Sequence, residues 1–189
     1  RELRSLAAQV AAFYEERGFF ARVTLPAQDI TDGVVRISVA EARVGRLKVE
    51  SRPGAALDPV HVERFVSSRL RSGEPLSLKA FERALLLAND IPGADVVGSL
   101  SQGTEHGETD LLIESRASKR IAGYAGASNS GSRATGVAQV TASAVLNSIA
   151  GAGEQLVVVG AKTEGMTFGR VEVSRPIGYD GLRASLFGS

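Results

Sequence analysis

The spacing of hydrophobic residues changes several times along the chain, and its clearest change lies within residues 77–115. Apolar residues recur there at helical spacing after Ser77, a residue type that favours the position just before a helix. Pro92 and Gly93 then prevent the helix from continuing. Two short apolar runs follow, separated by a polar, glycine-rich segment. The pattern predicts a helix, an abrupt stop and a β-hairpin, and the inward stripe of the helix is formed by Leu78, Phe81, Leu85 and Ala88.

A shorter arrangement of the same kind begins the chain. Apolar residues lie at helical spacing over residues 3–14, and Gly18 suits the left-handed residue that ends a helix. Residues 19–25 predict a strand and residues 28–33 a turn. One helix and two strands bury too little for a core, so we expect another strand and helix to precede this arrangement. The last strand is predicted to be half-buried through Val35, Ile37 and Val39.

Residues 45–116 predict a second unit. It begins with a strand that has one charged face. Asp58 and Pro59 suit the N-cap and first position of a helix, which we expect to run to the break at Gly73. Together with the helix and hairpin of residues 77–115, the order becomes β-α-α-β-β. About 70 residues are enough for such a unit to hold one core.

Beyond Ala117 the helical spacing ends, and small and β-branched residues dominate. Three segments alternate apolar and polar residues, as strands of a transmembrane barrel do. Two further segments are strand-like without a clear side, and a water-soluble antiparallel sheet remains the other interpretation. Because five strands cannot close a barrel and an open edge cannot face lipid, we expect the chain to continue past Ser189. The five candidate strands lie in residues 120–129, 138–146, 155–163, 170–177 and 182–186.

Composition and side-chain chemistry narrow the functional classes. The 22 Lys and Arg residues balance 21 Asp and Glu residues, which gives no indication of a nucleic-acid partner. The chain has no cysteine, which excludes disulfides, thiolate metal sites and thiol nucleophiles. His106, Glu108 and Asp110 alternate and could share one face near a metal, but a solvated turn is the simpler interpretation. We therefore predict no catalytic residue, no metal and no cofactor.

One surface is predicted to bind an extended client chain. If residues 94–100 form a sheet edge, their N–H and C=O groups can pair with an extended client chain. A groove between this edge and the helix over residues 59–71 would take the client's apolar side chains, if that helix leaves apolar surface uncovered. The alternative is an inert edge, kept short to avoid aggregation. The predicted client-binding residues are Ala94, Asp95, Val96, Val97, Gly98, Ser99, Leu100, Phe65 and Leu70.

Several segments resemble one known family, in order along the chain. Residues 17–29 and 32–37 resemble the end of a ShlB-type POTRA domain. Residues 85–93 and 107–111 resemble a second POTRA domain. Residues 128–136 and 174–178 resemble the first hairpins of a barrel. Together they resemble the two-partner secretion outer-membrane transporters, the hemolysin secretion and activation family typified by ShlB, FhaC and HecB. Ala42 departs from the pattern, because the family tends to have glycine between the two modules.

The resemblance implies a fold and a domain organisation. The fold class is α+β POTRA modules (β-α-α-β-β) followed by the first antiparallel strands of a transmembrane β-barrel. Residues 1–44 would be the C-terminal part of the first POTRA domain, residues 45–116 the second, and residues 117–189 about five barrel strands. A fragment of this kind is not expected to transport a client by itself.

The resemblance also implies a function. Such a transporter is not an enzyme: it lies in the Gram-negative outer membrane, with its POTRA modules in the periplasm. It captures an unfolded exoprotein, an adhesin or hemolysin, by its N-terminal secretion domain and passes it through the barrel. The expected partners of the monomer are this exoprotein and outer-membrane lipid, with no nucleic acid. Two alternatives remain: a general outer-membrane protein assembly factor of the same architecture, and a soluble periplasmic binding scaffold.

Overall fold

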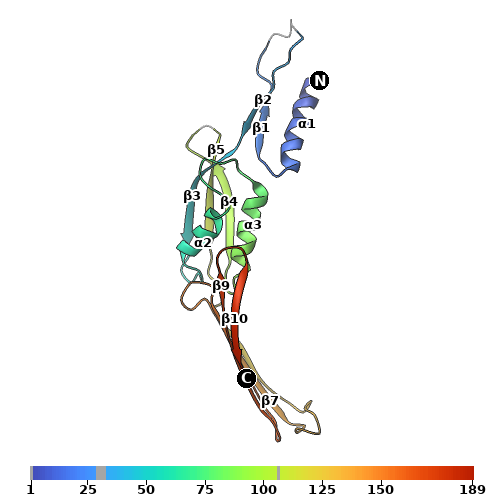
Figure 1. The fold of residues 1–189 in the computed structure, drawn as a ribbon, viewed down its shortest axis with the longest axis vertical. Helices are drawn as coiled ribbons and strands as arrows, with labels where there is room; N and C mark the ends of the chain where they lie inside the picture. The colour runs from blue at the N-terminus through green and yellow to red at the C-terminus, as the bar shows by residue number, and fades with distance from the viewer. Residues whose placement is uncertain (1, 29–32, 106) are drawn as a thin grey trace.

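The computed structural model describes residues 2–28, 33–105 and 107–189, and it shows an elongated molecule (Figure 1). A helix with a two-stranded sheet forms one end, a three-stranded sheet with two helices forms the middle, and a five-stranded sheet forms the other end. The elements are α1 Glu2–Glu16, β1 Ala21–Thr24, β2 Ser38–Glu41, β3 Arg43–Ser51, α2 Pro59–Ser67, α3 Leu78–Asn89, β4 Val96–Gln102, β5 Glu108–Ser115, β6 Ile121–Ser128, β7 Gln139–Asn147, β8 Gln155–Lys162, β9 Thr167–Ile177 and β10 Leu182–Gly188. Among the residues described, no helix is long and apolar enough to cross a membrane.

The first unit follows the sequence prediction except in its last strand. Helix α1 is followed by Gly18 in the left-handed conformation (φ 80°), and β1 pairs antiparallel with β2. The predicted turn falls partly on residues 29–32, which lie outside the described residues. Val35 and Ile37 are half-buried, but the strand begins only at Ser38 and its four residues are exposed. The prediction of a half-buried strand was therefore wrong for β2, because α1 packs against β1.

The middle unit has the predicted order of strand, helix, helix, strand and strand. Strand β3 pairs parallel with β5, and β5 pairs antiparallel with β4, so that β5 is central. Helix α2 ends at Ser67 rather than at Gly73, because the N–H groups of Arg69 and Leu70 both donate to the carbonyl of Val66 and close the last turn. Ser77 caps α3 as predicted, with its hydroxyl accepting the N–H of Ala80.

Helix α3 packs closely on β4, and this contact positions the sheet edge. The buried residues of α3 are Phe81, Ala84, Leu87 and Ala88, whereas the predicted inward residues Leu78 and Leu85 are only half-buried. The helix is thus rotated slightly from the predicted orientation. A Cβ atom at Gly98 of β4 would lie 2.6 Å from the ring of Phe81, so glycine is needed for this approach.

The five-stranded sheet has the order β10-β9-β8-β7-β6, with every neighbour antiparallel. Directly paired residues of an antiparallel sheet lie on the same face, so the register decides the side of each residue. One face carries an apolar row across all strands, and the strand with no clear side in the sequence contributes Leu156 to it. That row is Ile121, Leu146, Leu156, Val173 and Leu186.

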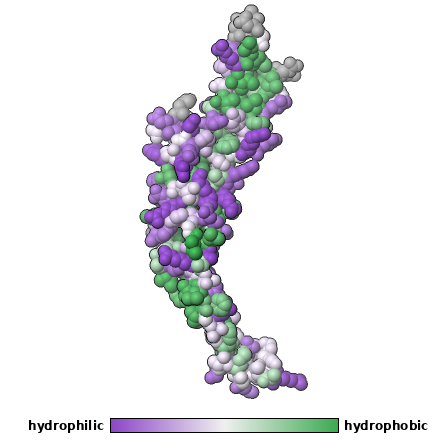
Figure 2. Space-filling model, viewed as in Figure 1, coloured by the Kyte–Doolittle hydropathy of each residue, from purple (hydrophilic) through white to green (hydrophobic). Residues whose placement is uncertain are grey.

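The apolar face is uncovered, while the opposite face carries most of the sheet's polar and charged residues. Ile121 is 70% exposed, Val173 50% and Leu186 80%. The opposite face carries Arg170 and Glu172, whose side chains pair at 2.9 Å. Figure 2 shows hydrophobic surface over the part of the molecule that this sheet forms, and again over the first unit. Exposed apolar area of this extent marks a surface that contacts lipid or protein.

Candidate functional site

Strand β4 lies at an edge of the middle sheet, as the sequence predicted for this segment. It pairs with β5 on one side, and β5 separates it from β3. The strand is displaced by two residues from the prediction, because it runs from Val96 to Gln102. Ala94 and Asp95 precede it, and the carbonyl of Asp95 accepts the N–H of Arg116.

The hydrogen bonds at the two ends of β4 show which backbone groups point outward. The N–H of Arg116 donates to Asp95 O at 2.8 Å, and the N–H of Gly103 donates to Glu108 O at 2.9 Å. Bonded pairs alternate along an antiparallel ladder, so the odd-numbered residues between these two positions bond to β5. The even-numbered residues direct N–H and C=O away from β5, and those within the strand are Val96, Gly98, Leu100 and Gln102.

The first of these outward pairs is already occupied by a side chain. The N–H of Val96 donates to Oδ1 of Asn89 at 2.8 Å, and Nδ2 of Asn89 donates to the carbonyl of Val96 at 2.7 Å. The amide thus imitates a neighbouring strand at this pair, since it supplies both an acceptor and a donor. Asn89 was not among the residues predicted for the client site. Its place at the end of α3, seven residues before the strand, was the available signal.

The helix beside β4 is α3 rather than α2, which corrects one part of the predicted site. Helix α2 packs against β3, the far strand of the sheet, whereas α3 packs against β4. Phe65 and Leu70 are only 3% and 5% exposed, so they leave no apolar surface for a client. Phe65 instead packs against the ring of Tyr179, with centroids 5.0 Å apart. On the α3 side, the residues next to Gly98 of β4 are Phe81 and the half-buried Leu85.

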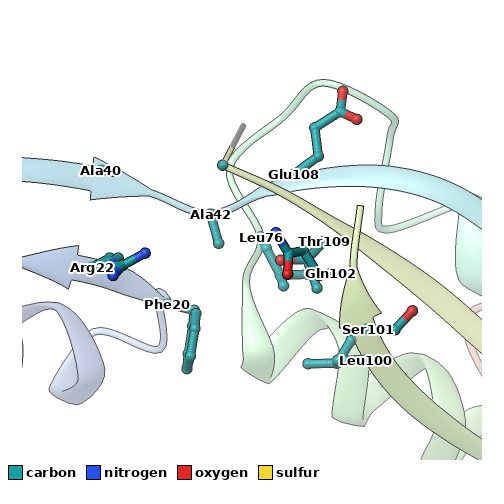
Figure 3. A pocket seen from close by; sticks show the side chains of 11 residues that line it. Phe20, Arg22, Ala40, Ala42, Leu76, Leu100, Ser101, Gln102, Glu108 and Thr109 are labelled. Atoms are coloured by element: carbon teal, nitrogen blue, oxygen red, sulfur yellow. The ribbon is translucent and has the colours of Figure 1, made fainter. Parts of the chain in front are cut away.

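A cavity of about 430 Å³ lies at the C-terminal end of β4, between this strand and β1 (Figure 3). The join between the two units forms part of its wall. The N–H of Ala42 donates to Phe20 O at 2.8 Å, and the N–H of Leu76 donates to Ala42 O at 2.7 Å. The lining residues are Phe20, Arg22, Ala40, Ala42, Leu76, Leu100, Ser101, Gln102, Gly107, Glu108 and Thr109.

The carboxylates near the hairpin turn have a structural role. Asp110 accepts hydrogen bonds from the backbone N–H of Arg46, at 2.8 Å, and from its guanidinium, and these bonds lower the pKa of Asp110. His106 lies outside the described residues, so the considered metal set of His106, Glu108 and Asp110 is not described as a whole. Across residues 2–28, 33–105 and 107–189, no three His, Asp or Glu side chains are grouped as metal ligands.

Comparison with known proteins supports the predicted family. Residues 1–42 match the family model of the POTRA domain, ShlB-type. HuxB of Haemophilus influenzae strain 86-028NP, named a heme/hemopexin transporter protein, is 30% identical over 156 residues, which are 82% of this chain and 27% of HuxB. CdiB of Dickeya dadantii, named an outer membrane transporter, is 24% identical over 157 residues, which are 82% of this chain and 26% of CdiB. The resemblance to two-partner secretion transporters is confirmed.

The chain spans about a quarter of the length of these relatives. Among solved structures, CdiB from Escherichia coli matches with a TM-score of 0.73 and 24% identity, over 94% of this chain and 33% of CdiB. BamA from Haemophilus ducreyi lacking POTRA domains 1–3 matches with a TM-score of 0.59 and 20% identity, over 98% of this chain and 36% of BamA. These structures show a shared POTRA-like fold of few helices and mixed sheets. The outer-membrane name of CdiB agrees with the expected localisation.

Two turns of the five-stranded sheet contact the middle unit. In the turn between β9 and β10, the guanidinium of Arg69 donates to Tyr179 O at 2.9 Å and pairs with Asp180 at 2.6 Å. In the turn between β7 and β8, the carbonyl of Gly151 accepts the N–H of Asp58 at 3.0 Å. Asp58 occupies the N-cap of α2, but its side chain makes no capping bond. These contacts join the α2 side of the middle unit to two turns of the five-stranded sheet.

Glu154 organises the turn between β7 and β8. Burial alone raises the pKa of Glu154, but hydrogen bonds from the backbone N–H groups of Glu154 itself, Ala150 and Ala152, with the charge of Arg175, outweigh it and lower the pKa. The ionised carboxylate is therefore the form that the folded turn favours. Its contribution is complete above the ordinary glutamate pKa of 4.5 and is lost as pH falls through the lowered folded value.

We expect Glu154→Gln to reduce thermal stability at pH 7 and to have a much smaller effect at the acidic pH where Glu154 is protonated in the folded chain. The measurement is calorimetric unfolding of the native and variant chains in detergent from pH 7 downward. Other carboxylates titrate equally in both chains, so the difference between the two isolates Glu154. A difference that does not change with pH would contradict the assigned role.

Proposed function

We propose that the chain is the part of a two-partner secretion transporter that receives an unfolded exoprotein and adjoins the outer membrane. In this proposal residues 1–44 belong to a first POTRA domain, residues 45–116 form a second, and residues 117–189 are the first strands of a β-barrel. The observation that carries the proposal is the open edge of β4, held by docked turns beside a sheet with an uncovered apolar face.

The β4 edge suits a client that arrives unfolded. Backbone pairing by β-augmentation depends little on client sequence, so one edge can receive successive segments of a long chain. Gly98, Leu100 and Gln102 direct their backbone groups outward, whereas those of Val97 and Ser99 bond to β5. The predicted site of residues 94–100 is thereby refined to the outward residues of β4. The partner is an exoprotein, an adhesin or hemolysin, recognised through its N-terminal secretion domain.

The five-stranded sheet suits the wall of a barrel. In a transmembrane barrel the apolar face contacts lipid and the polar face lines the interior. The paired Arg170 and Glu172 lie on the polar face, where water can solvate them. The uncovered apolar face disfavours the soluble-scaffold alternative, because water would contact it over five strands. The proposed activity is therefore binding and translocation by a monomer in the outer membrane, without catalysis or a cofactor.

The edge is tested by proline at two adjacent positions. Leu100→Pro removes an outward N–H, so we expect roughly tenfold weaker client binding with little loss of stability. Ser101→Pro removes an N–H that bonds to β5, so we expect a lower urea midpoint. Binding is measured by calorimetry with the N-terminal secretion domain of a two-partner exoprotein from the same organism. Unchanged binding by folded Leu100→Pro would remove β4 as the client site.

The barrel assignment is tested by arginine on the two faces of β8. Val158 lies opposite Val171 on the apolar face, and Val157 lies opposite Glu172 on the polar face. We expect Val158→Arg to deplete the gene product from the outer-membrane fraction of its host, because arginine facing mid-bilayer lipid costs about 2–4 kcal/mol. Val157→Arg is the matched control and should fractionate normally. Equal behaviour of the two variants would argue against a lipid-facing side.

A further inference from the structure

The open part of β4 ends at the cavity between the two units. Leu100 and Gln102 have outward backbone groups and also line the cavity. Phe20 and Arg22 line it from the side of β1. In Figure 3, Phe20 and Leu100 extend from opposite sides toward the same space. A strand added along β4 therefore leads to the mouth of this cavity.

The lining favours an uncharged, apolar occupant. Its wall includes Leu76 and Ala42, which are 1% and 9% exposed and keep fixed positions through their backbone hydrogen bond. The charged residues of the lining, Arg22 and Glu108, have opposite signs and so favour neither a cationic nor an anionic group. The volume of about 430 Å³ lies in the range of pockets that bind organic groups, ~300–1,000 Å³.

Asn89 limits where an added strand can lie. Because its amide already bonds to both backbone groups of Val96, the first outward pair open to another chain is that of Gly98. The open pairs then continue through Leu100 to Gln102, beside the cavity. Successive side chains of a strand point to opposite faces. A strand held in this register therefore directs a defined side chain toward the cavity.

We propose that this cavity binds a large apolar side chain of the exoprotein segment that extends β4. The inference rests on the proposed function, since it requires the added strand. It adds a preference for one side chain to an edge that otherwise recognises backbone. The client segment is thus held by three backbone pairs and one apolar anchor, and Asn89 keeps the segment from sliding past Gly98.

The test uses synthetic ten-residue peptides of alternating Val and Thr. One peptide carries Phe near its N-terminus and another carries Phe near its C-terminus, because an added strand can run parallel or antiparallel to β4. Matched peptides carry Ser in place of each Phe. Binding to the 189-residue chain in detergent is measured by fluorescence polarisation. We expect one Phe peptide to bind at least roughly tenfold more tightly than its Ser counterpart, because the cavity removes the ring from water.

Ala40→Trp, which fills the cavity, should abolish this difference. Val39 lies on the other face of the same strand, so Val39→Trp is the control and should retain the difference in affinity between the Phe and Ser peptides. Equal affinity of the Phe and Ser peptides for the unchanged chain would overturn the apolar anchor. If Leu100→Pro still weakened secretion-domain binding, the β4 edge would stand without the anchor. Absence of any peptide binding would also overturn the anchor, and the secretion-domain measurement would then decide the edge separately.

Discussion

The backbone of β4 pairs with β5 on one side, and its other side is open to an additional strand. The proposed client site depends on this open side. A sheet edge exposes a regular row of donors and acceptors that another chain can join. Here the amide of Asn89 closes the first pair, at Val96, and leaves the rest of the row accessible. Because Gly98 has no side chain, Phe81 and Leu85 of α3 pack directly over β4 at this position. The edge is thus bounded at one end and shaped along its length.

The second constraint is the position of this edge relative to the five-stranded sheet. Tyr179 packs against Phe65, and Arg69 bonds to the same turn, so the sheet is attached to the helical side of the middle unit. Phe65 is therefore important for docking rather than for direct contact with a client. At the opposite end of β4, the cavity beside Ala42 lies where the first unit joins. A chain held at β4 would lie between the first unit and the sheet.

Local signals in the sequence were enough for most elements. Ser77 capped its helix as predicted, and all five strands after Ala117 are present. The side of residues 155–163 could not be read locally, because both faces are apolar, and only pairing with β7 and β9 decides it. The helix beside the β4 edge was predicted to be α2 rather than α3, because the sequence does not reveal that β5 lies between β3 and β4 through a long-range parallel pairing. That pairing places α2 over β3 and buries Phe65 and Leu70.

Residue-resolved amide hydrogen exchange along β4 tests the central claim most directly. In the free chain, we predict slow exchange at Val97, Ser99 and Ser101, whose amides bond to β5, and fast exchange at Gly98, Leu100 and Gln102. The Val96 amide should exchange slowly and become fast in Asn89→Ala. Saturation with the secretion domain should slow the three fast amides. Amides of Gly98, Leu100 and Gln102 that remain fast in the saturated complex would contradict the account.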